Sequence, residues 1–495
     1  MPKYFPSNSP HLLTWRHRAA LAASAEAHHG AYLGHDEGGW RFAKPQHSVM
    51  VLGPPRSGKT TSLIIPNVLA SNGPVVSTST KPDVMDATSS ARAALGHCWL
   101  FDPTGSVEPT GAVRPLRWSP LQSSRTWVGA LSVARSLVEV GTGSGGRGST
   151  RAEGSHWSER AQALLAPLLH AAALDGSTMR TVLTWVDRHQ ALPAQQILAG
   201  EPGRTTELAR NLLDGLVATD QRELSGIWST TSGTLTGFRS DAALEATAEP
   251  DFDPDRFVRS SDTVYIAAPA HRQILVAPLV VGLIEDIRQA SYARAAAGGD
   301  QGRPSGPPVV LALDEVANIA PIPDLPATVS EGGGQGLVTL ACFQDLSQAR
   351  NRWPGQSEGF PSLFGTTVVL PGIGDVKTLE GLSTLAGDEE IPTRTVSAGR
   401  TLTDRPMVDL VTGGRPQFGE SVSTQWRRRL PADVIARGTP GHALAFDEHN
   451  EAGWIPLAPS HVAEPWRSLR HRVTLDRRPH RTIDGTVETA FGIGR

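Results

Sequence analysis

Short runs of apolar residues recur along the chain, each followed by polar or glycine-rich residues. Residues 48–52 and 309–313 are almost entirely apolar, and this pattern is typical of central strands in a parallel sheet. Residues 337–342 form a third run of the same kind. Shorter runs predict further strands at 75–77, 99–101, 264–267, 367–370 and 443–446. Together they predict an α/β fold with a mostly parallel sheet.

The pattern between residues 121 and 255 is different, because strand patterns are scarce there. Apolar residues follow helical spacing after Ser155, which we expect to cap the helix. The positions that set this spacing are Trp157, Ala161, Leu164, Leu165, Leu168, Leu169 and Ala172. Residues 181–198 and 207–219 also favour helices. We therefore predict an all-α segment inserted between two parts of the α/β fold.

The longest strongly apolar stretch runs from Ile274 to Ile284 and contains Pro278. It falls well short of the roughly 20 residues that a bilayer requires, so we predict a buried helix and no membrane span. We expect the protein to be cytoplasmic or peripheral at the inner face of the cell membrane.

Composition excludes several classes of protein. The 495 residues include 46 basic and 49 acidic side chains, a net charge of −3, which disfavours a protein that coats nucleic acid with its whole surface. A local basic channel remains compatible with this charge. Cys98 and Cys342 are the only cysteines, which excludes a disulfide framework or a cysteine-based zinc module and indicates an intracellular protein. The histidines show no metal-binding spacing, so we expect no zinc.

The strongest motif is Gly53-Pro54-Pro55-Arg56-Ser57-Gly58-Lys59-Thr60, which has the full spacing of a P-loop. It lies between the predicted strand 48–52 and a predicted helix at 61–69 that Pro66 shortens or kinks. Glycines let backbone N–H groups surround phosphates, and the helix N-terminus adds partial positive charge. The motif predicts ATP and Mg²⁺ as ligands, with Lys59 on the phosphates and Thr60 on the metal. The residues expected to bind the nucleotide are Gly53, Pro54, Pro55, Arg56, Ser57, Gly58, Lys59, Thr60 and Thr61.

Two acids follow the apolar run at 309–313. Asp314 is predicted to bind Mg²⁺, and Glu315 to orient or deprotonate the attacking water, because ligands bind at the carboxyl ends of parallel strands. Gln344 follows the run at 337–342 and is predicted to sense the γ-phosphate. Lys59, Glu315 and Gln344 are thus the candidate catalytic residues.

Other features divide the chain. The glycines from Gly332 to Gly336 predict either a close approach of backbones or a mobile loop. We expect an N-terminal helical or extended segment at 1–40, the first part of the α/β domain at 41–120, the all-α insertion at 121–255, the second part at 256–456 and a basic C-terminal tail at 457–495.

The ordered motifs resemble the conjugative type IV coupling proteins of the TraG and TraD type. The resemblance covers roughly residues 48–446 and is most specific between Asp314 and Leu325. Its matching positions are the P-loop, Ile64-Ile65-Pro66-Asn67, Phe101-Asp102-Pro103, Ser119-Pro120-Leu121, His156-Trp157, Leu313-Asp314-Glu315-Val316-Ala317-Asn318-Ile319, Ile322-Pro323-Asp324-Leu325 and Phe343-Gln344-Asp345-Leu346-Ser347-Gln348.

The resemblance implies a RecA-like P-loop NTPase with an inserted all-α domain that assembles into a homo-hexamer. It implies ATP-driven movement of single-stranded DNA, with its attached relaxase, into a type IV secretion channel. An arginine from the neighbouring subunit would complete the site, and Arg350 and Arg352 are the candidates.

Two alternatives stay open. An ATPase of the same fold would recruit or translocate a protein substrate through its helical insertion. A nucleotide-binding assembly module would switch conformation without turnover, although the presence of both Asp314 and Glu315 argues against it.

Overall fold

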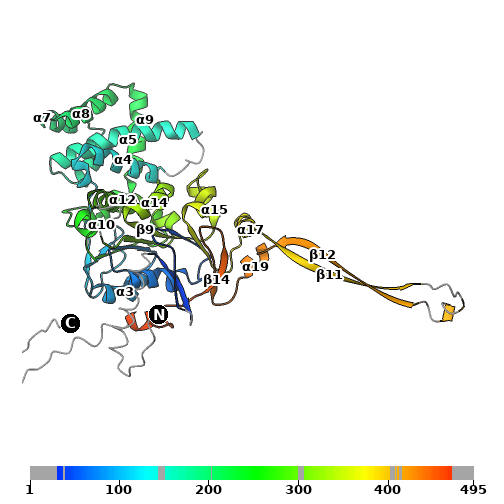
Figure 1. Ribbon diagram of the computed structural model, residues 1–495. Helices are drawn as coiled ribbons and strands as arrows, with labels where there is room; N and C mark the ends of the chain where they lie inside the picture. Colours follow the sequence, from blue (N-terminus) through cyan, green and yellow to red (C-terminus); the bar gives the residue numbers. More distant parts are fainter. Residues whose placement is uncertain are drawn as a thin grey trace, which may run out of the picture.

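The computed structural model describes residues 30–36, 39–142, 151–201, 203–298, 306–401, 407, 410–411 and 415–470. Its centre is a ten-stranded sheet in the order β14-β13-β10-β3-β9-β8-β4-β7-β5-β6 (Figure 1). The strands are β3 (Val49–Leu52), β4 (Val75–Ser79), β5 (Cys98–Phe101), β6 (Val113–Pro115), β7 (Thr263–Ala267), β8 (Val309–Leu313), β9 (Leu337–Phe343), β10 (Thr366–Val369), β13 (His442–Phe446) and β14 (Ala452–Pro456).

The sheet is parallel from β10 to β6, and only β13 and β14 add antiparallel pairs at one edge. All eight predicted strands are present, so the predicted α/β fold with a mostly parallel sheet is confirmed. The pattern of apolar residues does not predict the order of the strands. In the structure, β9 lies between β3 and β8. The carboxyl ends of these three strands therefore meet at one edge of the sheet.

Both faces of the sheet are buried, and successive strand residues point to opposite faces. In β3, Met50 and Leu52 belong to one apolar core, and Val49 and Val51 belong to the other. The first core includes α12 (Gln273–Ala297), whereas the second includes α2 (Ile65–Ala70) and α3 (Asp83–Arg92). Burial on both faces explains why these strands read as continuous apolar runs.

The segment between β6 and β7 is helical, as predicted. It contains η2 (Ser123–Arg125), α4 (Trp127–Gly141), α5 (Arg151–Leu174), α6 (Met179–Asp187), α7 (Leu192–Gly200), α8 (Arg204–Val217), α9 (Gln221–Thr234), η3 (Thr236–Phe238), α10 (Asp241–Ala246) and α11 (Pro254–Phe257). The expected cap at Ser155 is wrong, because α5 begins at Arg151 and Ser155 lies inside it.

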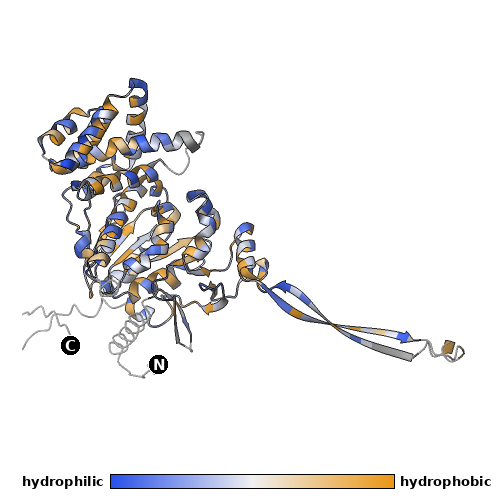
Figure 2. Ribbon diagram, turned by 45° about the horizontal axis from the view of Figure 1, so that its top comes forward, coloured by the Kyte–Doolittle hydropathy of each residue, from blue (hydrophilic) through white to orange (hydrophobic). Residues whose placement is uncertain are grey.

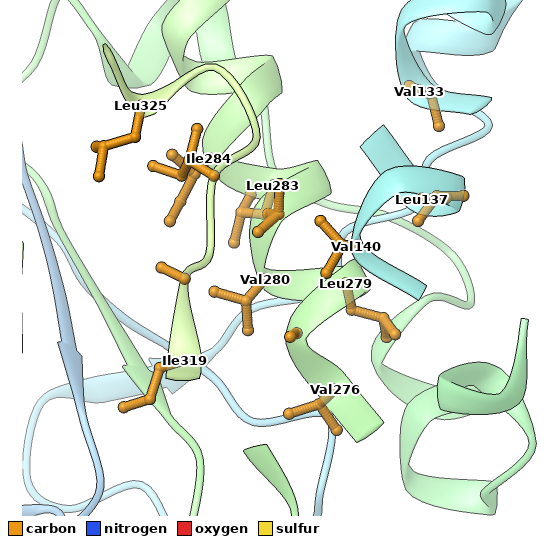
Figure 3. Packing of buried hydrophobic residues seen from close by; sticks show 14 of the residues in the cluster. Val133, Leu137, Val140, Val276, Leu279, Val280, Leu283, Ile284, Ile319 and Leu325 are labelled. Atoms are coloured by element: carbon orange, nitrogen blue, oxygen red, sulfur yellow. The ribbon is translucent and has the colours of Figure 1, made fainter. Parts of the chain in front are cut away.

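Helix α12 joins the helical part to the sheet. Its residue Leu279 lies beside Val140 of α4, while Ile284 lies toward Leu325 (Figure 3). These side chains are almost completely buried, apart from Val140, which keeps 7% of its surface. The predicted helix at 274–284 forms the first half of α12, with Pro278 inside it. It is buried from Val276 onward, whereas Ile274 and Leu275 are exposed. Within the described residues, no helix combines the length and apolarity needed to cross a membrane.

A long two-stranded arm leaves the body of the protein (Figure 1). It consists of β11 (Asp388–Thr401) and β12 (Arg415–Arg428), which pair antiparallel along their full length. Sequence analysis missed these strands because their residues are mostly polar, with few apolar positions in succession.

The remaining elements are short. They are β1 (Tyr32–Asp36), β2 (Gly39–Phe42), α13 (Val316–Ile319), α14 (Leu325–Glu331), η4 (Gly332–Gln335), α15 (Leu346–Arg352), η5 (Ser357–Gly359), α16 (Phe360–Leu363), α17 (Val376–Leu385), α19 (Ala432–Arg437) and α20 (Trp466–Arg470). Residues 457–470 were expected to begin a tail. Instead, Trp466 is fully buried against Tyr32 and Trp40, so this part belongs to the folded body.

Candidate nucleotide-binding site

The P-loop follows β3 and leads into a helix, as its motif predicts. The helix starts as a wide turn, η1 (Thr60–Ile64), and continues as α2. Pro66 lies in the first turn of α2, directly after η1, and the Thr61 carbonyl of the preceding turn accepts from the N–H of Ser460. The helix continues through Pro66, from Thr60 to Ala70. The predicted helix at 61–69 is therefore present, with one more residue at each end.

The loop bends through two residues with positive φ. Arg56 has φ = +65° and Gly58 has φ = +98°, and a glycine at position 58 adopts this backbone conformation without a steric penalty. Such bends turn successive N–H groups toward one concave side, which is how backbone nests hold anions. The first N–H groups of the following helix have no partners within the helix and add to this donor set.

Lys59 is buried at the centre of the loop. Its Nζ donates hydrogen bonds to the carbonyl oxygens of Gly53, at 2.5 Å, and Pro54, at 2.9 Å. Both partners are neutral, and no carboxylate among the described residues forms an ion pair with Lys59. A buried ammonium with only neutral partners favours a nearby anion, so the loop is electrostatically prepared for phosphate.

Thr60 and Asp314 bring the P-loop and the acid pair together. The Thr60 hydroxyl donates to Oδ2 of Asp314 at 2.6 Å, across a sequence separation of 254 residues. Asp314 is buried, which raises the pKa of its carboxyl, while the Thr60 hydrogen bond and the charge of Lys59 act in the opposite direction. Hydroxyl and carboxylate oxygens are ligands that Mg²⁺ prefers, so this pair fits the metal that the motifs predict.

Thr78 supports Asp314 from the neighbouring strand β4, and sequence analysis did not identify it. Its hydroxyl donates to the backbone carbonyl of Asp314 at 3.0 Å. The available signal was the run of hydroxyl residues Ser77, Thr78 and Ser79 at the end of an otherwise apolar strand. Because Thr78 is fully buried, this hydrogen bond fixes the turn that carries the acid pair.

Glu315 directly follows Asp314 and has a left-handed backbone, with φ = 55° and ψ = 46°. This conformation is uncommon for residues other than glycine, and it clusters at functional sites. The Glu315 carboxylate is half-buried and accepts a hydrogen bond from Nδ2 of Asn318 at 3.3 Å. The structure thus separates the acids: Asp314 faces Thr60, and Glu315 stands at the start of the next helix.

Gln344 lies at the same edge of the sheet, one residue beyond β9. The preceding carbonyl, that of Phe343, accepts a hydrogen bond from the N–H of Gly53 at 3.1 Å. The backbone N–H of Gln344 donates to Oε1 of Gln348 at 2.9 Å. Gln344 is therefore held beside the first residue of the P-loop.

The other predicted loop residues differ in exposure. Pro55 and Arg56 are exposed, whereas Pro54 and Ser57 are half-buried. The buried Oγ atom of Ser57 has no hydrogen-bond partner within the described part of the chain. Thr61 Oγ1 donates to the Gly58 carbonyl at 3.3 Å, and the Thr61 carbonyl accepts from the N–H of Ser460 at 2.8 Å. Within the described residues, the Ser57 hydroxyl is unsatisfied and the Lys59 ammonium has only neutral hydrogen-bond partners, and both features fit a bound phosphate chain.

The two arginines considered as candidates for the neighbouring site occupy α15. Arg350 forms an ion pair with Asp375 of its own chain. Arg352 is half-buried, and burial lowers the pKa of its guanidinium. Donation of an arginine to a neighbouring subunit stays a prediction for both.

Comparisons with known proteins agree with this geometry. The family described as "Type IV secretory system Conjugative DNA transfer" matches residues 16–407. The conjugal transfer protein TraG of Escherichia coli is 25% identical over 379 residues, which cover 71% of this chain and 56% of TraG. The chain therefore spans little more than half the length of that relative.

Solved structures of the coupling protein TrwB have a similar fold. The unbound monoclinic form gives a TM-score of 0.61 at 17% identity, covering 86% of this chain and 88% of that chain. The complex of TrwB with the non-hydrolysable ATP analogue ADPNP gives 0.59 at 16% identity, covering 83% and 86%. The complex with ADP and Mg²⁺ gives 0.56 at 15% identity, covering 84% and 86%. At these identities the likeness establishes the fold: a RecA-like P-loop fold with an inserted helical domain.

Proposed function

The chain belongs to the type IV secretory system family of conjugative DNA transfer, and we propose on this premise that it is an ATP-driven motor that moves single-stranded DNA toward a secretion channel. The proposal includes a relaxase bound to the DNA, contact with type IV secretion components and assembly into a homo-hexamer. Membership of the family supports a role in conjugative DNA transfer. The geometry of the nucleotide site supports ATP hydrolysis as the source of energy.

The hydrogen bond between Thr60 and Asp314 carries the proposal. A P-loop match alone is shared by many nucleotide-binding proteins. Here Asp314, directly after β8, lies against the residue that follows the P-loop lysine, as hydrolysis of a nucleoside triphosphate with a divalent metal requires. TrwB, which has the same fold, was solved with an ATP analogue and with ADP and Mg²⁺.

The site residues receive distinct roles in this proposal. The backbone N–H groups of the P-loop and Lys59 bind the phosphates, and Thr60 with Asp314 holds Mg²⁺. When bound, Mg²⁺ neutralises charge on the phosphate oxygens. Glu315 accepts a proton from the attacking water, and Gln344 contacts the γ-phosphate from the end of β9. The helical insertion and the arm are then available for the DNA, for protein substrates and for other subunits.

The ATPase rate of the whole chain, with and without single- or double-stranded DNA at low salt, tests the proposal. We expect hydrolysis that single-stranded DNA stimulates several-fold and that added salt reduces, because phosphate contacts release counterions. Lys59→Ala should abolish nucleotide binding or hydrolysis. Lys377→Ala is a matched control, because Lys377 is an exposed lysine on α17 paired with Glu358.

The outcomes separate the parts of the proposal. Absence of hydrolysis under every condition would contradict the motor. Hydrolysis without DNA binding or stimulation would remove DNA as the substrate and favour the protein-translocating alternative. Nucleotide binding without turnover would favour the assembly module.

A further inference from the structure

The β11–β12 arm lacks the support that two-stranded sheets normally need. Its strands pair from Asp388↔Arg428 at the base to Thr401↔Arg415 at the far end, and Arg429 N–H closes the base on the Gly387 carbonyl at 3.0 Å. Fourteen residues per strand correspond to a length of about 45 Å. An isolated hairpin in water is marginally stable, so a ribbon of this length calls for a surface that covers it.

One face of the arm is more apolar than the other. Cross-strand partners share a face, and every second pair lies on the same side. The pairs Glu390↔Trp426, Arg394↔Val422 and Val396↔Glu420 place three large apolar side chains on one face. The opposite face carries the hydroxyl pairs Thr393↔Ser423 and Thr395↔Ser421, and Ile391 is its large apolar side chain. This alternation is typical of a sheet with one covered face.

The apolar face is open in the described part of the protein. Val396 is 62% exposed, Val422 is 66% exposed and Trp426 is 67% exposed. Figure 1 shows the arm extending away from the sheet and the helical part, and Figure 2 shows the same separation from a second direction. A tryptophan and two valines aligned on one exposed face mark an interaction surface rather than scattered surface residues.

The charge of the arm identifies the kind of partner. Residues 388–428 contain six acidic and six basic side chains, so the arm has no net charge. On the apolar face, Arg394 pairs with Glu420, and Arg428 pairs with Asp388 at 3.2 Å. Binding to a nucleic-acid backbone or to an anionic membrane needs excess positive charge. A ribbon without net charge that carries large apolar side chains and two ion pairs on one face fits a protein surface instead.

The chain enters the arm from the edge of the sheet that carries the nucleotide site. Strand β10 leads to the arm through α17, and its end is bonded to the end of β3, because Leu370 N–H donates to the Leu52 carbonyl at 2.8 Å. Leu52 immediately precedes the P-loop. A folded body of about 400 residues has a diameter of roughly 50 Å, so the arm is long enough to reach across another subunit.

We propose that the face of the arm carrying Val396, Val422 and Trp426 packs on a second copy of this chain and links neighbouring subunits. The inference deepens the proposed function, because it rests on assembly of the motor and assigns the arm to that assembly. Two observations favour another subunit as the partner: the arm carries no net charge, and its length is enough to reach across a folded body of this size.

Sedimentation velocity of the whole chain with a non-hydrolysable ATP analogue tests the inference. One variant replaces residues 391–425 with Asn-Gly, a two-residue turn that rejoins the pair Glu390↔Trp426. The second combines Val422→Glu with Trp426→Ser. We expect both to weaken self-association at least about 10-fold. The matched control, Thr395→Glu with Ser423→Glu, adds charge to the opposite face and should associate like the unmodified chain.

A fluorescence measurement adds an independent readout. Both native cysteines are buried, so Val396→Cys introduces one exposed thiol for an environment-sensitive dye, and Thr395→Cys is its control. Raising the protein concentration should shift the emission to the blue for the label at position 396 only. Equal shifts at both positions would overturn the assignment of the apolar face.

Other outcomes overturn the inference without deciding the ATPase of the proposed function. Unchanged association of the arm-deleted chain would exclude the arm as a link. A chain that stays monomeric at all concentrations would overturn this inference and also the homo-hexamer of the proposed function, whereas its ATPase would be judged separately. Loss of single-stranded DNA binding with unchanged association would assign the arm to DNA. Nucleotide binding, compared with that of Lys59→Ala, is measured separately, so an inactive P-loop and an unused arm give different results.

Discussion

The hydroxyl of Thr60 donates a hydrogen bond to the carboxylate of Asp314 at 2.6 Å, although 254 residues separate them. Asp314 directly follows β8, Thr60 ends the P-loop that follows β3, and a single strand, β9, lies between β3 and β8. The contact joins a donor-rich loop to a buried acid whose pKa is raised, mainly by burial. Two motifs that are separate in the sequence thus form one site.

Asp314→Asn should weaken the metal-dependent part of nucleotide binding. The amide keeps an oxygen that accepts the Thr60 hydrogen bond but loses the negative charge that a divalent cation needs. We expect nucleotide affinity with Mg²⁺ to fall at least about 10-fold, with a smaller change in the presence of a chelator. Titration calorimetry under both conditions measures this. An unchanged Mg²⁺ dependence would show that Asp314 does not hold the metal.

Glu315→Gln should separate binding from hydrolysis. The glutamine keeps the length of the side chain and can still accept a hydrogen bond from Asn318, but it cannot take a proton from water. We expect turnover to fall about 100-fold or more while nucleotide affinity stays within a few-fold of the unmodified chain. Glu331→Gln, at an exposed position at the end of α14, serves as the control. Normal turnover in Glu315→Gln would assign the base elsewhere.

Gly333→Ala should destabilise the protein, whereas Gly334→Ala should not. A Cβ atom at position 333 would lie 1.9 Å from the carbonyl oxygen of Gln46, and one at 334 would meet nothing within 4 Å. The forced shift of backbone should cost about 1–3 kcal/mol. Thermal unfolding of the two variants measures the difference. Equal melting temperatures would mean that η4 is a mobile loop. They would exclude a close approach of its backbone to Gln46 as the reason for the glycine run.

Arg92→Met should cost about 3 kcal/mol or more of stability. The Arg92 side chain is buried, and it donates to the carbonyls of Ser71, Gly73 and Ser261 and to the Thr263 hydroxyl. Methionine has similar length but leaves these acceptors without donors. Denaturant unfolding measures the stability of Arg92→Met and of a control, Arg114→Met. The control alters an exposed arginine on β6 and should change stability by less than about 0.5 kcal/mol. Equal losses would show that the carbonyls find other donors.

Asp286→Asn should change how stability depends on pH. Burial raises the pKa of Asp286 from 3.8 to about 6, although Trp118 Nε1 donates to its Oδ2 at 2.7 Å. Between these two values the folded chain keeps a proton that the unfolded chain has lost, so this group's stabilising contribution falls as pH rises from about 4 to 6 and stays lower above that. The Asp286→Asn variant has no group that titrates here, so it does not lose stability in this way as pH rises. Its stability relative to the unmodified chain should therefore rise with pH over the same window.

The full size of that change is about 3 kcal/mol, the free-energy equivalent of the difference in pKa. Unfolding measured at pH 4.5 and at pH 8 tests it, with Asp255→Asn as a control at an exposed position. The same difference in stability at both values of pH would contradict the raised pKa.

The sequence by itself determined the elements that local pattern controls. Apolar runs of about five residues such as 309–313 become strands buried on both faces, because a central strand of a parallel sheet exposes neither face to water. The P-loop spacing determined the turn around Gly58, because phosphate-binding loops need particular residue types at fixed positions. Helical spacing determined α5, although it placed the start of that helix five residues too late, because ends of helices depend on contacts outside the pattern.

Only the tertiary structure decided which distant residues meet. The order β3-β9-β8 places Thr60 against Asp314 and Gln344 beside Gly53, and no local pattern encodes the order of strands in a sheet. Thr78 supports Asp314 through a hydrogen bond between strands, which leaves little trace in a sequence. The sequence pattern did not predict the arm, because its strands are mostly polar and are stabilised by pairing with each other. The apolar side chains on one of its faces could be recognised as an interaction surface only after the structure showed that this face is exposed.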